Sequence, residues 1–142
     1  MSAREATHKA MRHRVLIVDD EESMRLFLAR ILVTGLQAEV TLAGTCEQAL
    51  HLAGNYAYDA ILLDLLMPGI GGYEVLKRLR RASPNVATPV IIVSVLSDAA
   101  TQKRCMKSGA TGYLVKPVER NTLVSTIKAQ LAGRGKPKST RK

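Results

Sequence analysis

The alternation of two kinds of segment along the chain constrains the fold more than any other feature. Five short apolar runs are separated by longer segments whose apolar residues recur at helical spacing. Near-continuous apolar runs are typical of strands buried on both faces, and their alternation with helices predicts a parallel sheet covered by helices, the α/β class. The expected strands span residues 14–18, 38–43, 59–65, 89–95 and 111–115. The expected helices span residues 21–34, 45–53, 72–81, 98–107 and 119–131.

Capping and breaking residues set the expected ends of these helices. Gly35 is expected to stop the first helix. Thr45 is expected to cap the second, which has Glu47 and Gln48 in its first turn. Gly133 closes the last helix.

The composition suits one domain, which we place at residues 13–132. The chain has 142 residues, 46% of them apolar, and this length supports a sizeable core without disulfide or metal staples. Cys46 and Cys105 lack metal-type spacing and are interpreted as small buried hydrophobic residues in a reducing compartment. The sequence shows neither a signal peptide nor an apolar run of about 18 residues, so we expect a cytoplasmic protein with no membrane segment.

The formal net charge of +9 is concentrated at the two ends of the chain. Most of it falls in residues 1–14 and 134–142, and the stretch between them is nearly neutral. We interpret residues 1–12 as a flexible basic tail and residues 133–142 as a disordered basic tail rich in Gly, Pro and Lys. Neither tail has an aromatic residue that could stack on bases, so we do not expect nucleic acid as a partner.

Polar residues stand at the ends of four of the five expected strands. Asp19 and Asp20 follow the first strand, Asp64 lies near the end of the third in the stretch AILLDLLMPG, Ser94 is in the fourth and Lys116 follows the fifth. The carboxyl ends of parallel strands meet in one crevice, so we expect these side chains to converge. Each acid alone could be a helix cap, but the whole set has no such explanation.

Three clustered carboxylates suit Mg²⁺, which takes hard oxygen ligands and bridges to phosphate oxygens. A carboxylate left free could attack phosphorus and form an acyl phosphate, and the ammonium group of Lys116 would offset the developing negative charge. Asp64 is the candidate nucleophile, because Pro68 and Gly69 then turn the chain away and leave its carboxylate accessible.

Four motifs closely resemble the receiver domain of two-component response regulators, over residues 13–132. They are VLIVDDEESMR (15–25), ILLDLLMPGIGGYEVLKRLR (61–80), PVIIVSVLSD (89–98) and SGATGYLVKPV (108–118). The resemblance implies a flavodoxin-like (βα)5 fold with a five-stranded parallel sheet in the order 2-1-3-4-5. It also implies that the chain takes a phosphoryl group from a sensor histidine kinase or a histidine phosphotransfer protein and is not a turnover enzyme.

The resemblance assigns a role to each candidate residue. Asp64 is the phosphoacceptor, and Mg²⁺ is bound by Asp19, Asp20, Asp64 and the backbone carbonyl of Leu66. Lys116 and Ser94 bind the phosphoryl group.

The resemblance also implies a switch. Ser94 and Tyr113 move on phosphorylation, and the Lys116–Pro117 peptide bond is cis. The surface that changes is formed by segments 98–107, 111–115 and 119–131, and it binds a downstream protein or a second copy of the chain.

Three positions depart from the commonest family pattern. Val95 stands where small residues are usual and should crowd the crevice. Leu66 and Leu96 occupy the two variable positions beside the site, and neither side chain can orient an attacking water. We therefore expect slow self-dephosphorylation.

The sequence argues against two other functions, and two further possibilities concern how a receiver would work. A phosphatase of the haloacid dehalogenase type needs a second Asp at the position of Leu66, and a dinucleotide-binding module needs a Gly-rich loop in place of residues 19–22. The chain could also be the receiver part of a larger regulator whose output domain is missing, or a binding module that works without phosphorylation.

Overall fold

A computed structural model of the protein describes residues 12–133. The two tails predicted from the sequence therefore lie, apart from residues 12 and 133, outside the described residues. Within the described part, no helix is both long and apolar enough to cross a bilayer.

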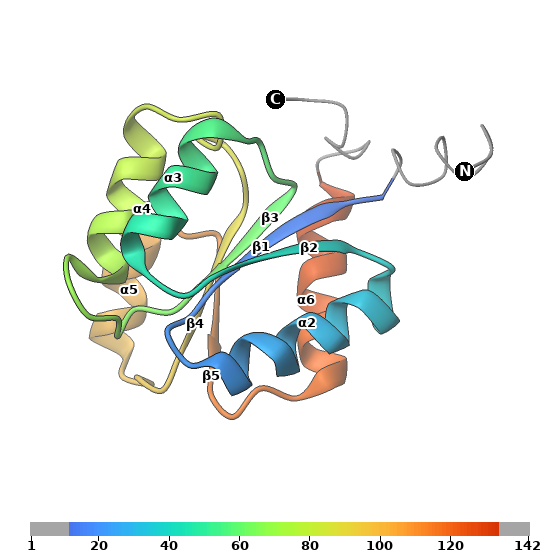
Figure 1. Cartoon of the computed structure of the whole chain (residues 1–142). Helices are drawn as coiled ribbons and strands as arrows, with labels where there is room; N and C mark the ends of the chain where they lie inside the picture. The colour runs from blue at the N-terminus through green and yellow to red at the C-terminus, as the bar shows by residue number, and fades with distance from the viewer. Residues whose placement is uncertain (1–11, 134–142) are drawn as a thin grey trace.

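Five parallel strands form one sheet in the order β2-β1-β3-β4-β5 (Figure 1). The strands are β1 (Arg14–Val18), β2 (Glu39–Ala43), β3 (Ala60–Leu63), β4 (Val90–Ser94) and β5 (Gly112–Val115). The helices, with the labels of Figure 1, are α2 (Glu22–Leu36), α3 (Cys46–Asn55), α4 (Gly71–Arg81), α5 (Ala99–Lys107) and α6 (Arg120–Ala132). The class and the strand order expected from the sequence are both confirmed.

The sheet separates two apolar cores, because successive side chains of a strand point to opposite faces. In β1, Leu16 and Val18 pack into one core, and Val15 and Ile17 into the other. Helices α3, α4 and α5 cover the first face, and α2 and α6 cover the second (Figure 1). The central strands are buried on both sides, which explains their near-continuous apolar sequences.

The expected end of α2 is wrong. The helix runs through Gly35 to Leu36, and the residue that ends it is Gln37, in the left-handed conformation with φ of 53°. A Cβ atom on Gly35 would lie only 2.8 Å from Cγ2 of Val124 on α6. Gly35 thus lets two helices pack closely instead of stopping the first.

Three other expectations are confirmed. Thr45 caps α3, where its hydroxyl accepts a hydrogen bond from the backbone N–H of Gln48 at 3.0 Å. Cys46 and Cys105 are free thiols and are buried. After β3 the chain turns at Gly69, whose φ of +90° is a conformation that favours glycine.

Candidate functional site

Asp64 lies immediately after β3, and the neighbouring backbone fixes its position. Its N–H donates to the carbonyl of Val18 on β1 at 3.0 Å. The loop that follows bends back so closely that a Cβ atom on Gly72, in the first turn of α4, would collide with the Asp64 carbonyl oxygen. The absence of a side chain at Gly72 therefore allows α4 to pack against the backbone that carries the Asp64 carboxylate.

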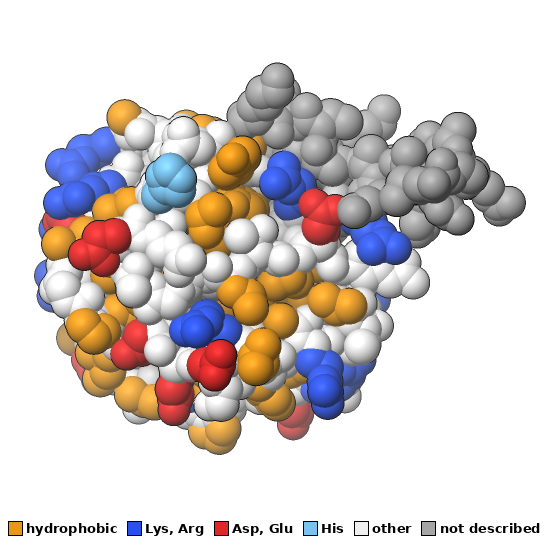
Figure 2. All heavy atoms as spheres, in the orientation of Figure 1, with side chains coloured by type: hydrophobic (Ala, Val, Ile, Leu, Met, Phe, Trp, Pro, Cys, Tyr) orange, Lys and Arg blue, Asp and Glu red, His pale blue; other side chains and the backbone are white. Residues whose placement is uncertain are grey.

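Three carboxylates meet at this edge of the sheet. Asp19, Asp20 and Asp64 can each offer one oxygen such that all three oxygens lie within 4.8 Å of one another. Asp20 is exposed together with Glu21 and Glu22, whereas Asp19 and Asp64 are buried. The turn at Gly69 therefore leaves the Asp64 carboxylate less accessible than the sequence predicted, with 7% of its side chain exposed. In Figure 2, acidic side chains gather toward the lower edge of the face shown, where α2 begins in Figure 1.

Asp19 does not act as a helix cap. Its Oδ1 accepts a hydrogen bond from the N–H of Glu21, the residue before the helix, at 2.9 Å. Glu21 is itself the N-cap residue of α2, and its side chain makes no capping hydrogen bond. Helix capping therefore does not explain the aspartate at position 19, as expected from the sequence.

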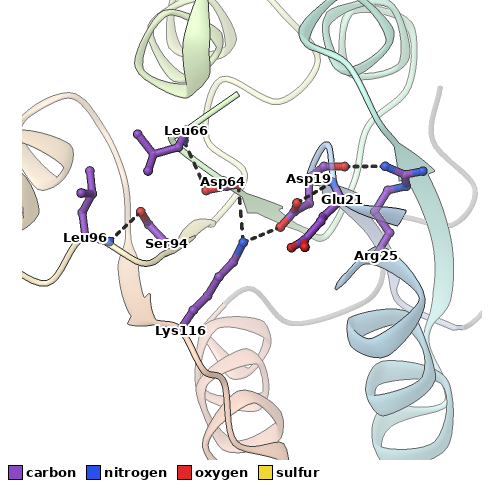
Figure 3. A network of polar contacts seen from close by, with 8 residues as sticks. All are labelled: Asp19, Glu21, Arg25, Asp64, Leu66, Ser94, Leu96 and Lys116. Carbon is purple, nitrogen blue, oxygen red and sulfur yellow. Dashed lines mark hydrogen bonds and ion pairs between the residues drawn. The ribbon is translucent and has the colours of Figure 1, made fainter. Parts of the chain in front are cut away.

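Lys116 lies between the two buried carboxylates (Figure 3). Its Nζ is 2.8 Å from Oδ2 of Asp19 and 3.5 Å from Oδ2 of Asp64, so the shorter ion pair is the one with Asp19. Burial alone would lower the pKa of Lys116, but the hydrogen bond to Asp19 and the charges of both carboxylates raise it above its usual value. The side chain is therefore a fixed positive charge.

One lysine does not neutralise three acids. Burial raises the pKa of Asp64, the charge of Lys116 lowers it, and the charge of Asp19 raises it again, with a net increase. Three carboxylates and one ammonium group leave a formal charge of about −2, which one divalent cation would balance. The donor set, composed of hard oxygen atoms, fits Mg²⁺.

Ser94 is fully buried at the end of β4, next to this group. Its carbonyl accepts the N–H of Lys116 at 2.8 Å, and its hydroxyl accepts the N–H of Leu96 at 3.2 Å. The carbonyl of Leu96 in turn accepts a hydrogen bond from the hydroxyl of half-buried Tyr113 at 2.6 Å. The loop after β4 thus links Ser94 to Tyr113 on β5, and the Lys116–Pro117 peptide bond that follows is cis.

The three residues that depart from the commonest pattern differ in how far they are exposed. Leu66 is 52% exposed, and its N–H donates to Oδ1 of Asp64 at 3.3 Å (Figure 3). Val95 is 59% exposed, and Leu96 is partly buried against the core. None of these three side chains offers a polar group to the site.

Arg25 is a neighbour of the site that the sequence analysis missed. Its Nη1 donates to the backbone carbonyl of Asp19 at 2.7 Å. A signal was present in the sequence, because a cation near the N-terminus of a helix opposes the helix dipole and calls for another explanation.

Comparison with known proteins decides the family. The family model described as the response regulator receiver domain matches residues 15–128, which span most of the chain. The chain belongs to the response regulator receiver family. The resemblance drawn from the four sequence motifs is therefore confirmed.

Curated relatives are longer than this receiver chain. The response regulator GacA of Pseudomonas aeruginosa is 36% identical over 122 residues, which are 84% of this chain and 56% of that protein. The DNA-binding response regulator MtrA of Mycolicibacterium paratuberculosis is 32% identical, over 85% of this chain and 52% of that protein. The chain thus spans about half the length of these relatives.

Two solved receiver structures share this fold over nearly their whole length. The chemotaxis protein CheY4 of Vibrio cholerae has 32% identity and a TM-score of 0.79, over 84% of this chain and 99% of that one. The receiver domain of sensor histidine kinase PA1611 from Pseudomonas aeruginosa has 25% identity and a TM-score of 0.78, over 85% of this chain and 98% of that one. The PA1611 receiver holds a magnesium ion coordinated in its active site cleft.

Proposed function

We propose that this receiver accepts a phosphoryl group on Asp64 from the phosphohistidine of a sensor histidine kinase or a histidine phosphotransfer protein. The observation that carries the proposal is the meeting of Asp19, Asp20 and Asp64 within 4.8 Å, with Lys116 between the two buried carboxylates. Membership of the receiver family supports it.

In the proposed reaction, a carboxylate oxygen of Asp64 attacks phosphorus. The new oxygen–phosphorus bond forms as the bond from phosphorus to the imidazole nitrogen breaks, and the electron pair of that bond stays on the imidazole. Bound Mg²⁺ would supply positive charge that offsets the charge of the transferring group and keeps Asp64 ionised. Lys116, already charged and directed toward Asp64, would hold a phosphoryl oxygen.

The proposed metal ligands are Asp19, Asp20, Asp64 and the backbone carbonyl of Leu66. The magnesium ion in the PA1611 receiver supports this assignment, since both chains have the receiver fold. Phosphorylation modifies the protein itself and turns over no substrate, so the chain is proposed to be a signalling module and not an enzyme.

The proposed output is a change of surface. Ser94 and Lys116 would move to bind the phosphoryl oxygens, and the link from Ser94 through Leu96 to Tyr113 would carry the change to α5 and β5. A downstream protein, or a second copy of the chain, would read the face formed by α5, β5 and α6. The longer relatives also support a regulator in which this domain acts on an attached output domain.

Intact-mass spectrometry after incubation with acetyl phosphate tests the proposal. The wild-type chain should gain one phosphoryl group in the presence of Mg²⁺ and none in the presence of EDTA. Asp64→Asn should gain none in either buffer. No adduct under any condition, and none with a histidine kinase as donor, would favour a binding module that works without phosphorylation.

A further inference from the structure

The acidic turn at the end of β1 is held from two sides. On the side facing the crevice, Lys116 pairs with the carboxylate of Asp19 at 2.8 Å. On the other side, Arg25 reaches back from the first turns of α2 and donates to the backbone carbonyl of the same residue at 2.7 Å (Figure 3). The main chain of Asp19 is also bonded to β2, because its N–H donates to the Ala43 carbonyl at 3.1 Å.

The guanidinium group of Arg25 lies against a glycine that leaves room for it. A Cβ atom on Gly44, in the turn between β2 and α3, would lie 2.8 Å from Nη1 and 3.2 Å from Cζ of Arg25. The turn itself is fixed, since the N–H of Gly44 donates to Oε1 of Gln48 at 2.8 Å and the N–H of Gln48 donates to the Thr45 hydroxyl. The capped start of α3 therefore holds the surface on which Arg25 rests.

We propose that Arg25 is a positioning residue for divalent cation binding, holding the Asp19 backbone so that the carboxylates of Asp19 and Asp20 face Asp64. The inference rests on the proposed function, because the cation is the Mg²⁺ proposed for this site. Gly44 takes part indirectly, since it admits the guanidinium group.

The sign of the effect separates positioning from simple charge. Arg25 is a positive charge near a cation site, so its removal should strengthen Mg²⁺ binding if only electrostatics mattered. If Arg25 positions the ligands, its removal should weaken binding, and loss of a residue that orients metal ligands typically costs at least about tenfold in affinity.

The experiment is calorimetric titration of the full chain with Mg²⁺, without any phosphoryl donor. Arg25→Met should bind Mg²⁺ about tenfold more weakly than the wild type. Gly44→Ala keeps every charge but displaces the guanidinium group, so it should weaken binding to a similar extent. The double variant should be no weaker than either single variant, because both changes break the same contact.

Two controls address charge and folding. Arg30→Met removes an exposed arginine from the same helix and should leave the affinity unchanged. Thermal unfolding in EDTA should show each variant folded at the titration temperature.

Each outcome has a distinct meaning. A folded Arg25→Met variant that binds Mg²⁺ as tightly as the wild type, or more tightly, would overturn the inference and leave the proposed function intact. If Arg25→Met bound Mg²⁺ weakly while Gly44→Ala bound it as tightly as the wild type, the role of the Gly44 contact would be overturned. If the wild type itself bound no Mg²⁺, the proposed function would fail at its metal step.

Discussion

At the scale of single residues, the site keeps negative charges together at a cost to stability. Asp64 is buried, shares its surroundings with Asp19, and receives only the longer of the two contacts from Lys116. The result is a raised pKa, mainly because burial disfavours the charged carboxylate. The charge that makes Asp64 a nucleophile therefore opposes folding until a cation binds.

Asp64→Asn should consequently be more stable than the wild type in metal-free buffer at neutral pH. The native state holds the Asp64 proton more tightly than the unfolded chain, so the cost of ionisation is absent below the unfolded pKa of about 3.9 and grows as pH rises through the native value. The variant's melting temperature should exceed that of the wild type by a few degrees at pH 7, and by less near pH 4.

Mg²⁺ is the control for this prediction. It should raise the melting temperature of the wild type by mass action and reduce the difference between the two proteins. A variant that melted below the wild type at neutral pH without metal would contradict the electrostatic account of Asp64.

The apolar residues at the two variable positions, Leu66 and Leu96, should prolong the lifetime of the phosphoryl group on Asp64. Leu66 lies beside Asp64 and Leu96 lies beside Ser94, and neither side chain has a group that could hydrogen-bond an attacking water (Figure 3). The double substitution Leu66→Asn, Leu96→Glu should shorten the phosphoryl lifetime at least several-fold, as measured by the decay of the phosphorylated mass. An equal or longer lifetime in the double variant would refute this prediction.

At the scale of elements, the packing of α4 behind β3 sets the position of Asp64. The close contact of Gly72 with the backbone of Asp64 and Leu65 leaves no space for a side chain. Neither partner is a flexible side chain, so relief requires the helix or the loop to shift.

Gly72→Ala should therefore destabilise the protein by about 1–3 kcal/mol, as overpacking typically does, and should weaken Mg²⁺ binding as Asp64 shifts. The matched control is Gly54→Ala in α3, where an added Cβ meets nothing within 4 Å. Because Ala favours a helix more than Gly, the control should be neutral or more stable by up to about 1 kcal/mol. Chemical denaturation of both variants gives the comparison, and equal stabilities would exclude the steric explanation.

Helix α5 is the element best suited to move. Among its nine residues only Cys105 is buried, and the helix lies between the loop after Ser94 and the strand that carries Tyr113. Helices with few buried residues open at the lowest free energy.

Ser94→Ala should accept the phosphoryl group but lose its effect on this region. In the wild type, phosphorylation should change the hydrogen exchange of residues 95–118, and in the variant the exchange of that segment should stay as it was. A normal exchange response in a phosphorylated Ser94→Ala protein would show that the signal passes by another route.

The elements themselves were largely predictable from the sequence, because apolar runs and helical spacing reflect burial directly. The ends of the helices were less predictable, because one residue type such as glycine can either end a helix or allow close packing. A glycine such as Gly35 is typical of a helix end, but here its lack of a side chain lets α2 pack against Val124 on α6. The residue that does end α2, Gln37, has no such signal.

At the scale of the whole molecule, the sheet order brings together residues that are up to 97 positions apart. Lys116 and Asp19 form an ion pair although they stand at opposite ends of the domain, because β1 and β5 both end at the same edge. This convergence follows from the topology, so the residues Asp19, Asp20, Asp64, Ser94 and Lys116 could be grouped from the sequence.

Individual contacts within the group could not be predicted in the same way. The preference of Lys116 for Asp19 over Asp64, and the contact of Arg25 with the Asp19 carbonyl, depend on side-chain rotamers and on the path of loops. Sequence spacing determines which strand ends meet, and packing then decides which atoms touch.

Chemical trapping can show whether Asp64 itself becomes an acyl phosphate. Borohydride reduces an acyl phosphate of aspartate to homoserine, so peptide mapping after reduction identifies the phosphorylated residue. We expect homoserine at position 64 in the wild type after treatment with acetyl phosphate and Mg²⁺, and none when Mg²⁺ is omitted. A phosphoryl group found on another residue, or homoserine at position 64 that forms equally well without metal, would contradict it.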